Sequence, residues 1–253
     1  MSADSYPLQK ITSTLLPLPH GCFTRDGGCS TGPYASLNIG YSTGDSPRRV
    51  DSNRERICNH LKLDRLVAMH QVHGEEVLTV TGPPREDHEN ARVCDALITS
   101  RPGIGLLVQH ADCQPILLHD PRTRAIGAVH SGWRGSVANI AAKTIAAMQR
   151  CYGTEPADIN AFVGPSLGPC CAEFINFKEE LPGWMHPFQV KATYFDFWEI
   201  TRQQLLQAGV PENQIELAAV CTRCSNLYFS YRRTQGRPQR LTGRNGSVIA
   251  LPR

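Results

Sequence analysis

Two short apolar runs in the middle of the chain, 104–108 and 126–129, constrain its fold more than any other feature. Both are rich in β-branched and aliphatic residues and stop at polar turns, a pattern that predicts buried strands. The first run leads to Cys113 and the second to His130. From residue 136 to 148 the apolar residues recur at helical spacing, which predicts one helix of about four turns. The sequence therefore predicts two strand ends that bring a cysteine and a histidine to the N-terminus of a helix.

Further elements follow from the same patterns. We expect strands at 22–23, 66–69, 76–80, 159–163, 215–220 and 227–231, and helices at 48–61 and 197–208, the second capped by Asp196. In the first helix Val50, Ile57 and Leu61 are expected to face inward and Asn53 to face elsewhere. Residues 83–90 are expected to form a polar loop.

The patterning predicts one domain of mixed α and β structure. No internal repeat, linker-like segment or low-complexity tract divides the chain, so we expect a single catalytic domain over 21–253, preceded by a Pro-rich N-terminal lead over 1–20 that lies on the surface. The strands do not alternate with helices regularly enough for a doubly wound parallel sheet. Patterning alone therefore supports only the class, mixed α/β (α+β).

The composition is that of a folded protein, because 41% of the residues are hydrophobic and 19% are charged. The net charge of +3 is too small to indicate nucleic-acid binding. No apolar run reaches the roughly 18 residues that a membrane span needs, and residues 1–10 lack the pattern of a secretory signal. We therefore expect a cytoplasmic protein with no membrane or nucleic-acid partner, in which the ten cysteines are reduced.

Three side chains at the ends of predicted strands could form a metal site: His73, Cys113 and His130. Two imidazoles and a thiolate suit zinc, and three protein ligands leave a fourth position open for water or substrate. Their spacing along the chain matches no short zinc motif. The same residues could form a nucleophilic pair, with Cys113 attacking and His130 or His73 as the base, or could be buried structural residues. The residue chemistry leaves these alternatives open.

Other reactive residues carry weaker signals. Cys221-Thr222-Arg223-Cys224 is a single Cys-x-x-Cys pair, which without a second pair favours a structural interpretation. His70 and His110 could support the candidate ligands, serve as alternative bases or be core histidines, and the last interpretation is favoured. The arginine-rich stretch 230–246 is typical of a solvated surface but also suits a phosphate, which arginine binds in a bidentate manner.

The chain resembles the laccase-domain family of the bacterial YfiH/YlmD type, once called multicopper polyphenol oxidoreductases. The resemblance covers nearly the whole chain in separate blocks: Thr24-Arg25-Asp26-Gly27-Gly28, Ser36-Leu37-Asn38-Ile39-Gly40, Asn53-Arg54, Gln71-Val72-His73-Gly74, Asp95-Ala96-Leu97, Ala111-Asp112-Cys113-Gln114-Pro115, His130-Ser131-Gly132-Trp133-Arg134-Gly135, Gly164-Pro165-Ser166-Leu167-Gly168-Pro169, Cys221-Thr222, Ser230-Tyr231-Arg232-Arg233 and Thr242-Gly243-Arg244.

The resemblance implies a zinc-dependent purine nucleoside enzyme with mixed sheets in an α-β-β-α layered sandwich. Such enzymes phosphorolyse adenosine, inosine and S-methyl-5'-thioadenosine to a free base and a pentose 1-phosphate, and deaminate adenosine to inosine. The family's metal ligands correspond to His73, Cys113 and His130, which would also be the catalytic residues. The expected partners are purine nucleosides and inorganic phosphate, and the oligomeric state is left open. The older family name implies copper and phenol oxidation, but the chain lacks the repeated His-x-His pairs of a multicopper cluster.

The resemblance also indicates substrate-binding candidates. Arg134, expected near the N-terminus of the central helix, could bind phosphate or pair with a carboxylate. Asp112 could be a general base or could hold a turn. The remaining candidates lie in family blocks: Arg25, Asn38, Arg54 and Arg232.

Three other functions remain as alternatives to the nucleoside enzyme. A cysteine hydrolase or amidase would act on a substrate such as a cell-wall precursor and would work without metal. A copper-containing polyphenol oxidase would oxidise phenols. A non-catalytic partner of nucleotides or cell-division proteins would bind without Cys113.

Overall fold

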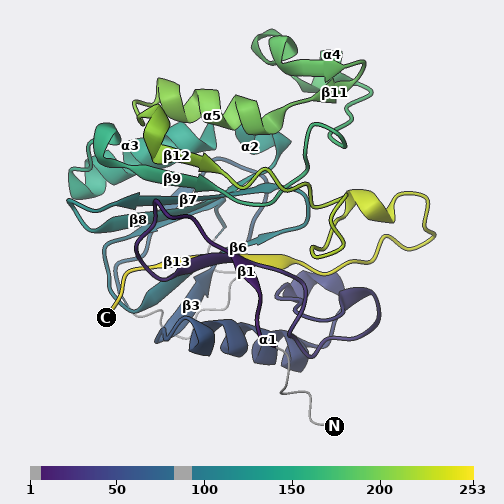
Figure 1. The fold of residues 1–253 in the computed structure, drawn as a ribbon, viewed down its shortest axis with the longest axis horizontal. Coiled ribbons are helices and arrows are strands. Elements are labelled where there is room, and N and C mark those ends of the chain that lie inside the picture. The colour runs from purple at the N-terminus through teal and green to yellow at the C-terminus, as the bar shows by residue number, and fades with distance from the viewer. Residues whose placement is uncertain (1–6, 83–92) are drawn as a thin grey trace.

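Two β-sheets packed face to face lie at the centre of the fold, with helices on both outer faces (Figure 1). The computed structural model describes residues 7–82 and 93–253, so the loop expected at 83–90 lies outside the described residues. The predicted α-β-β-α sandwich of mixed sheets is confirmed.

The first sheet has five strands in the order β1-β2-β13-β6-β3. Its pairs are antiparallel except β3 with β6, which is parallel. The strands are β1 (Lys10–Ile11), β2 (His20–Phe23), β13 (Asn245–Ala250), β6 (Ile104–His110) and β3 (Arg65–Ala68).

The second sheet has six strands in the order β12-β9-β7-β8-β5-β4. Its inner pairs are antiparallel, whereas β12 pairs with β9, and β4 with β5, in parallel. The strands are β12 (Ile215–Leu217), β9 (Asn160–Val163), β7 (Gln114–Asp120), β8 (Ala125–Ser131), β5 (Ala96–Thr99) and β4 (Val77–Thr79).

Helices cover the outer faces of both sheets (Figure 1). The five-stranded sheet packs against α1 (Pro47–His60), and the six-stranded sheet packs against α3 (Ile140–Tyr152) and α5 (Phe197–Gln207), with α2 (Trp133–Val137) beside them. The segment between β9 and α5 contains α4 (Phe177–Glu180), β10 (Gln189–Lys191) and β11 (Tyr194–Phe195). The short 3-10 helices are η1 (Gly32–Tyr34), η2 (Tyr41–Thr43), η4 (Pro156–Asp158), η5 (Gly183–Phe188), η6 (Glu212–Gln214) and η7 (Arg232–Thr234).

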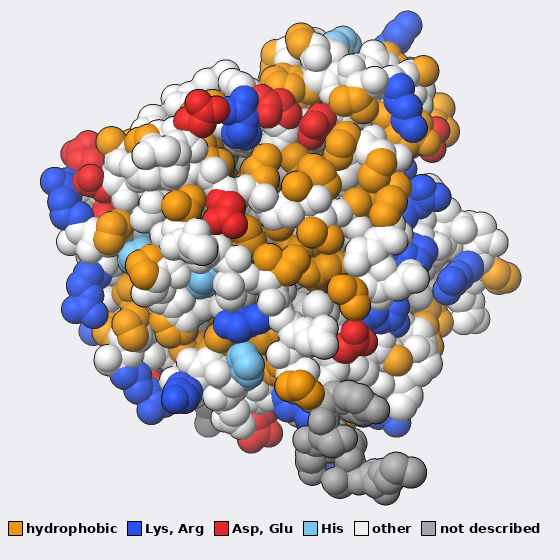
Figure 2. Space-filling model, in the orientation of Figure 1, with side chains coloured by type: hydrophobic (Ala, Val, Ile, Leu, Met, Phe, Trp, Pro, Cys, Tyr) orange, Lys and Arg blue, Asp and Glu red, His pale blue; other side chains and the backbone are white. Residues whose placement is uncertain are grey.

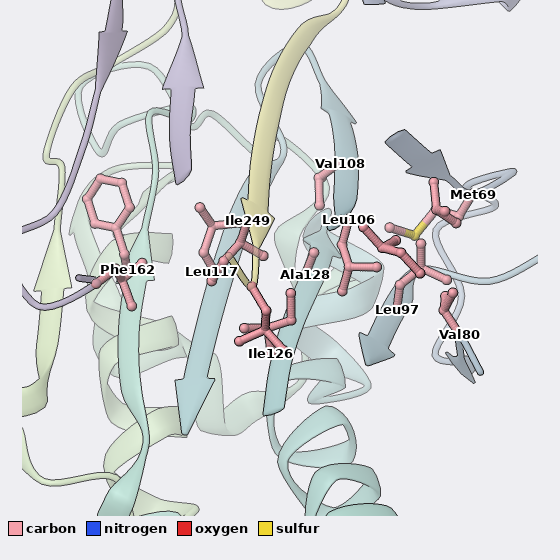
Figure 3. Packing of buried hydrophobic residues seen from close by; sticks show 14 of the residues in the cluster. Met69, Val80, Leu97, Leu106, Val108, Leu117, Ile126, Ala128, Phe162 and Ile249 are labelled. Carbon is pink, nitrogen blue, oxygen red and sulfur yellow. The ribbon is translucent and has the colours of Figure 1, made fainter. Parts of the chain in front are cut away.

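The main core lies between the sheets, where side chains of both inner faces interdigitate (Figure 3). Every residue of β6, β7 and β8 is buried, because each strand faces the other sheet on one side and a helical layer on the other. This double burial explains why the sequence shows continuous apolar runs there instead of the alternation of half-exposed strands.

The surface is mixed in character. On the face drawn in Figure 2, Lys and Arg side chains lie mainly around the edge, with acidic and hydrophobic side chains between them. Within the described ranges, no helix combines the length and apolar character that crossing a membrane requires.

The predicted central helix is wrong in one respect: it is two helices. The chain breaks between α2 and α3 at Asn139, which has a φ of 54°. The Asn139 side chain accepts a hydrogen bond from the Ala142 backbone N–H and so caps α3. Asparagine adopts the left-handed conformation more readily than most residues and is a preferred N-cap, so a local cap outcompetes the continuous apolar stripe.

The predicted strand at 227–231 is also wrong. Phe229 is fully buried there, but its backbone N–H and C=O bind the Asn245 side chain at 2.8 and 2.9 Å. The Asn245 amide thus satisfies the backbone groups that a neighbouring strand would otherwise bind.

Two smaller predictions are also wrong. Asn53, expected to face away from the core, is fully buried and bonds to the backbone around residues 29–38. The N-terminal lead is not wholly a surface segment, because Leu16 is 2% exposed and joins the main core. The predicted cap of α5 is confirmed, since Asp196 accepts hydrogen bonds from the Trp198 and Glu199 backbone N–H groups.

His20 makes the stability of this fold pH-dependent. Its Nε2 accepts from the Ser13 backbone N–H at 2.8 Å, so Nδ1 carries the proton and donates to the Leu18 carbonyl at 2.8 Å. Burial lowers the pKa of His20 below its ordinary 6.5. Because the unfolded chain then binds the proton more readily, the contribution of His20 should be present above pH 6.5 and decline as the pH falls below it.

We expect His20→Gln to be less stable than the wild type by about 1–2 kcal/mol at pH 7. The difference should shrink at pH 5, because glutamine does not titrate. Urea unfolding of both proteins at the two pH values measures it. A difference that stays constant with pH would contradict the neutral tautomer.

Candidate metal centre and adjoining cavities

His73, Cys113 and His130 converge at one end of the sandwich, with ligand atoms within 4.8 Å of one another. His130 belongs to β8, Cys113 lies in the connection from β6 to β7, and His73 lies in the loop between β3 and β4. The antiparallel register of β7 and β8 places His130 opposite Pro115, two residues beyond Cys113. The ring centroids of the two histidines are 4.9 Å apart. The structure therefore brings the whole predicted ligand set together.

The buried carboxylate of Asp95 organises this set. The His130 ring donates from Nδ1 to Asp95 Oδ1 at 2.8 Å, which leaves Nε2 available as a ligand atom. The backbone N–H groups of Val72, His73 and Gly74 donate to the same carboxylate at 3.2, 3.0 and 2.6 Å. Asp95 thus fixes both the imidazole of His130 and the loop that carries His73, whose φ is 58°.

The electrostatics favour the charged forms of this group. Burial raises the pKa of Asp95, but hydrogen bonds from His130 and the loop outweigh this and lower it overall. Burial raises the pKa of the Cys113 thiol, whereas the two neighbouring histidines lower it to about 6. For His130 burial lowers the pKa, while Cys113 and Asp95 raise it to about 9. A thiolate is therefore accessible at neutral pH, which both metal binding and nucleophilic attack require.

Gly132 makes room for the three side chains. A Cβ at this position would lie 2.5 Å from His73 Nδ1 and 3.2 Å from Cys113 Sγ. The glycine following the His130-Ser131 pair is thus required for close approach rather than for a special backbone conformation.

The donor set fits a single zinc ion. Two imidazoles and a thiolate are zinc ligands, and an imidazole whose second nitrogen donates to a carboxylate is the usual supporting arrangement. The same donors can also bind copper. Three side chains cannot hold a cluster of several copper ions.

Two cavities meet at Cys113. The aromatic cavity, of about 190 Å³, is lined by Asp112, Gln114, Leu167, Ala172, Phe174, Phe197 and Arg232, among others. The polar cavity, of about 520 Å³, is lined by His70, Gln71, His73, Gln109, His110, His130 and Arg244, among others. Ala111, Cys113, Trp133 and Tyr231 line both. The Cys113 side chain, a candidate metal ligand, therefore lies at the junction of an apolar and a polar cavity.

Of the substrate-binding candidates, Asp112 and Arg232 lie in the wall of the aromatic cavity. The Asp112 carboxylate accepts from Thr222 Oγ1 at 2.7 Å and from the Arg232 backbone N–H at 2.6 Å. The Arg232 guanidinium donates to the Glu173 carbonyl at 2.9 Å. In the structure both side chains hold the loops that form this wall.

The other four candidates lie outside both cavities. Arg25 donates to the Ala35 carbonyl, and Arg54 donates to the Ile39 carbonyl. Asn38 is fully buried and bonds within its own loop and to the Arg244 backbone. The exposed Arg134 stacks on Trp133, with Cζ 4.3 Å from the ring centroid.

Three residues of the site were not predicted from the sequence. Asp95 was identified only as part of a family block. An aspartate that precedes a predicted strand gives no indication that it is buried. Arg244 lay in the arginine-rich stretch but was not singled out, although it lines the polar cavity. His110, interpreted as a core histidine, is 1% exposed and lines this cavity, and burial holds its pKa at about 3.

Removing the charge of Asp95 should weaken metal binding. We expect Asp95→Asn to lower zinc affinity by roughly 10- to 100-fold. An amide has one accepting oxygen, so it cannot serve both His130 Nδ1 and the three backbone N–H groups of the His73 loop. Competition with a chromogenic chelator measures the affinity. Asp64→Asn, at an acid whose side chain is 60% exposed, is the matched control and should leave affinity unchanged. Equal affinities for all three proteins would contradict the role of Asp95.

Known proteins resemble this chain in both sequence and fold. The family model described as multi-copper polyphenol oxidoreductase laccase matches residues 19–252. A protein named purine nucleoside phosphorylase from Deinococcus radiodurans is 36% identical over 265 residues, covering 100% of this chain and 96% of the relative. Purine nucleoside phosphorylase ORF3 from Streptomyces griseus is 37% identical, covering 96% of this chain and 99% of the relative.

A solved structure agrees with these sequence matches. The crystal structure of YlmD from Geobacillus stearothermophilus superposes with a TM-score of 0.86 at 32% identity, covering 98% of this chain and 97% of that chain. The resemblance seen in the sequence blocks is thereby confirmed, and the chain belongs to the YfiH/YlmD-type family of multi-copper polyphenol oxidoreductase laccases.

Proposed function

We propose that this protein is a zinc-dependent purine nucleoside phosphorylase. Its substrates would be adenosine, inosine and S-methyl-5'-thioadenosine, and it would also deaminate adenosine to inosine. The observation that carries the proposal is the convergence of His73, Cys113 and His130 where an aromatic and a polar cavity meet. The relatives named purine nucleoside phosphorylase support the phosphorylase activity, while the deamination and the choice of nucleosides follow from the family resemblance.

The aromatic cavity suits the purine base. Trp133, Phe174 and Phe197 line it, and aromatic faces bind a flat heterocycle by stacking. Phe174 and Phe197 already pack on each other with centroids 5.1 Å apart, so this wall is formed before a base enters.

The polar cavity suits the pentose and the phosphate. Arg244 lines it, and a guanidinium binds phosphate oxygens with two parallel hydrogen bonds. His110 lines the same cavity, and its Nδ1 has no hydrogen-bond partner in the described part of the chain. Because burial keeps this ring neutral, its Nδ1 retains an unused hydrogen-bonding capacity in the wall of the cavity.

The reaction would then take place at the junction. Phosphorolysis forms a bond from phosphate to C1' of the pentose and breaks the bond from C1' to the base, which leaves with a proton. When bound, zinc supplies Lewis acidity and lowers the pKa of water to about 7, the chemistry that deamination at C6 of a purine needs. Asp95 keeps the His130 ring in one orientation, and Asp112 keeps the Arg232 loop against the base.

Cys113→Ala should abolish both activities. With adenosine and phosphate the wild type should form adenine, ribose 1-phosphate and inosine, and without phosphate only inosine. Chromatography of the products and the zinc content of the same samples test this. Cys151→Ser, at an exposed thiol on α3, is the control and should behave as the wild type.

Other outcomes would replace the proposal. Copper in the site with phenol turnover would establish the polyphenol oxidase. Activity that survives removal of metal but is lost on thiol alkylation would establish the cysteine hydrolase.

Arg244→Ala should raise the KM for phosphate by roughly 10- to 100-fold, the loss expected for a charged hydrogen bond. Adenosine deamination consumes no phosphate and should fall far less, which separates a binding defect from misfolding. Arg134→Ala is the comparison, because the sequence indicated Arg134 as a candidate for phosphate binding. If only Arg134→Ala raises the KM for phosphate, the phosphate site lies at α2 instead.

A further inference from the structure

Four thiol groups gather at a second place in the molecule, apart from the metal centre. Their Sγ atoms all lie within 4.8 Å of one another. We call these residues the cysteine cluster: Cys170, Cys171, Cys221 and Cys224. We propose that the cysteine cluster is a second metal site, in which four thiolates bind one structural zinc ion.

The sheet topology explains why the two pairs meet. β9 and β12 are parallel neighbours, so their carboxyl ends lie at the same edge of the six-stranded sheet. The segments that follow stay together, because the Ser166 N–H donates to the Val220 carbonyl and the Thr222 N–H donates to the Ser166 carbonyl. The first segment then reaches Cys170 and the second reaches Cys221 and Cys224, so that Cys170 and Cys224, 54 residues apart in sequence, come into contact.

The sulfur atoms are as close together as ligands of one tetrahedral zinc ion must be. A Zn–S bond of about 2.3 Å in a tetrahedron separates neighbouring sulfurs by about 3.8 Å. Cys224 Sγ lies 3.6 Å from Cys170 Sγ and 3.4 Å from Cys171 Sγ. A disulfide needs about 2.05 Å, and all four cysteines are free thiols.

Simple core packing does not account for the cluster. Cys170 and Cys224 are exposed, whereas a cysteine that serves as a small hydrophobe is buried. Exposed thiols gathered at this spacing gain little from one another unless a cation binds them.

The surrounding chain is prepared for such a site. Arg223 Nη1 lies 3.5 Å from Cys171 Sγ, where its charge offsets part of the negative charge of four thiolates. The guanidinium of Arg233 donates to the carbonyls of Thr222, Arg223, Ser225 and Tyr228 and so holds the turn that carries Cys221 and Cys224. The turn therefore has its shape before a metal enters, and binding displaces the thiol protons without any redox change.

The position of the cluster indicates its role. Leu167 and Ala172, on the segment that carries Cys170, line the aromatic cavity. Thr222, within the other pair, donates to Asp112 in the same wall. A metal ion here would fasten two irregular segments to each other and thereby stabilise that wall.

The test separates this site from the metal centre. In the double variant His73→Ala and His130→Ala the metal centre is removed, and protein purified without added metal should retain one zinc ion per chain. Adding Cys170→Ser and Cys224→Ser to it should remove this zinc and lower the melting temperature. Adding Cys151→Ser instead should change neither.

A spectroscopic measurement covers the case in which the serine variants fail to fold. Cobalt(II) titrated into the metal-stripped double variant should give the absorption of tetrahedral cobalt with four thiolates, at one equivalent per chain. The proposal is overturned if the double variant holds no zinc and gives no such spectrum, or if mass spectrometry finds the four cysteines as disulfides after purification under reducing conditions. Because the double variant lacks the metal centre, neither result depends on whether the proposed nucleoside chemistry is correct.

Discussion

The candidate metal centre depends on one buried ion, the carboxylate of Asp95. Each of its oxygens accepts two hydrogen bonds, Oδ1 from the His73 N–H and His130 Nδ1, and Oδ2 from the Val72 and Gly74 N–H groups. A buried charge is costly unless its oxygens are bonded in this way. The same four bonds fix an imidazole and a loop that no regular secondary structure holds. The buried carboxylate therefore holds His130 and the His73 loop together in one site.

The strand order explains how the remaining groups reach that ion. β7, β8 and β5 lie side by side, so the residues at their ends form a row: Cys113 before β7, His130 in β8 and Asp95 before β5. Cys113 also lies where the chain crosses from the five-stranded to the six-stranded sheet. A crossing of this kind opens the end of the sandwich, and the two cavities meet there.

What the sequence could predict was decided by burial. Doubly buried strands such as β6 and β8 leave continuous apolar runs, and the ligand chemistry of a histidine or cysteine beside such a run is visible without any structure. Features held by single side-chain hydrogen bonds were not predictable. Asn139 breaks the central helix, Asn245 replaces a strand beside Phe229, and Asp95 anchors the ligands, yet each is one polar residue in an unremarkable context.

The cysteine cluster could not be predicted from the sequence either. A Cys-x-x-Cys sequence is informative only with its partner, and the partner pair here is an adjacent Cys170-Cys171 that no spacing rule connects to it. The connection is made by the parallel pairing of β9 with β12, a long-range contact that a local pattern does not encode.

The two clusters therefore serve different parts of one site. The metal centre lies on strand ends within a rigid sandwich, so its ligands are positioned by the sheet itself. The wall of the aromatic cavity is built from irregular segments, residues 164–174 and 221–234, whose shape depends on side-chain contacts from Asp112 and Arg233. Beyond the backbone bonds around Ser166, these segments have few ladder hydrogen bonds to offset the conformational entropy that ordering them costs. A metal cross-link between these two segments would therefore stabilise the wall of the aromatic cavity, and the proposed zinc site of the cysteine cluster lies between them.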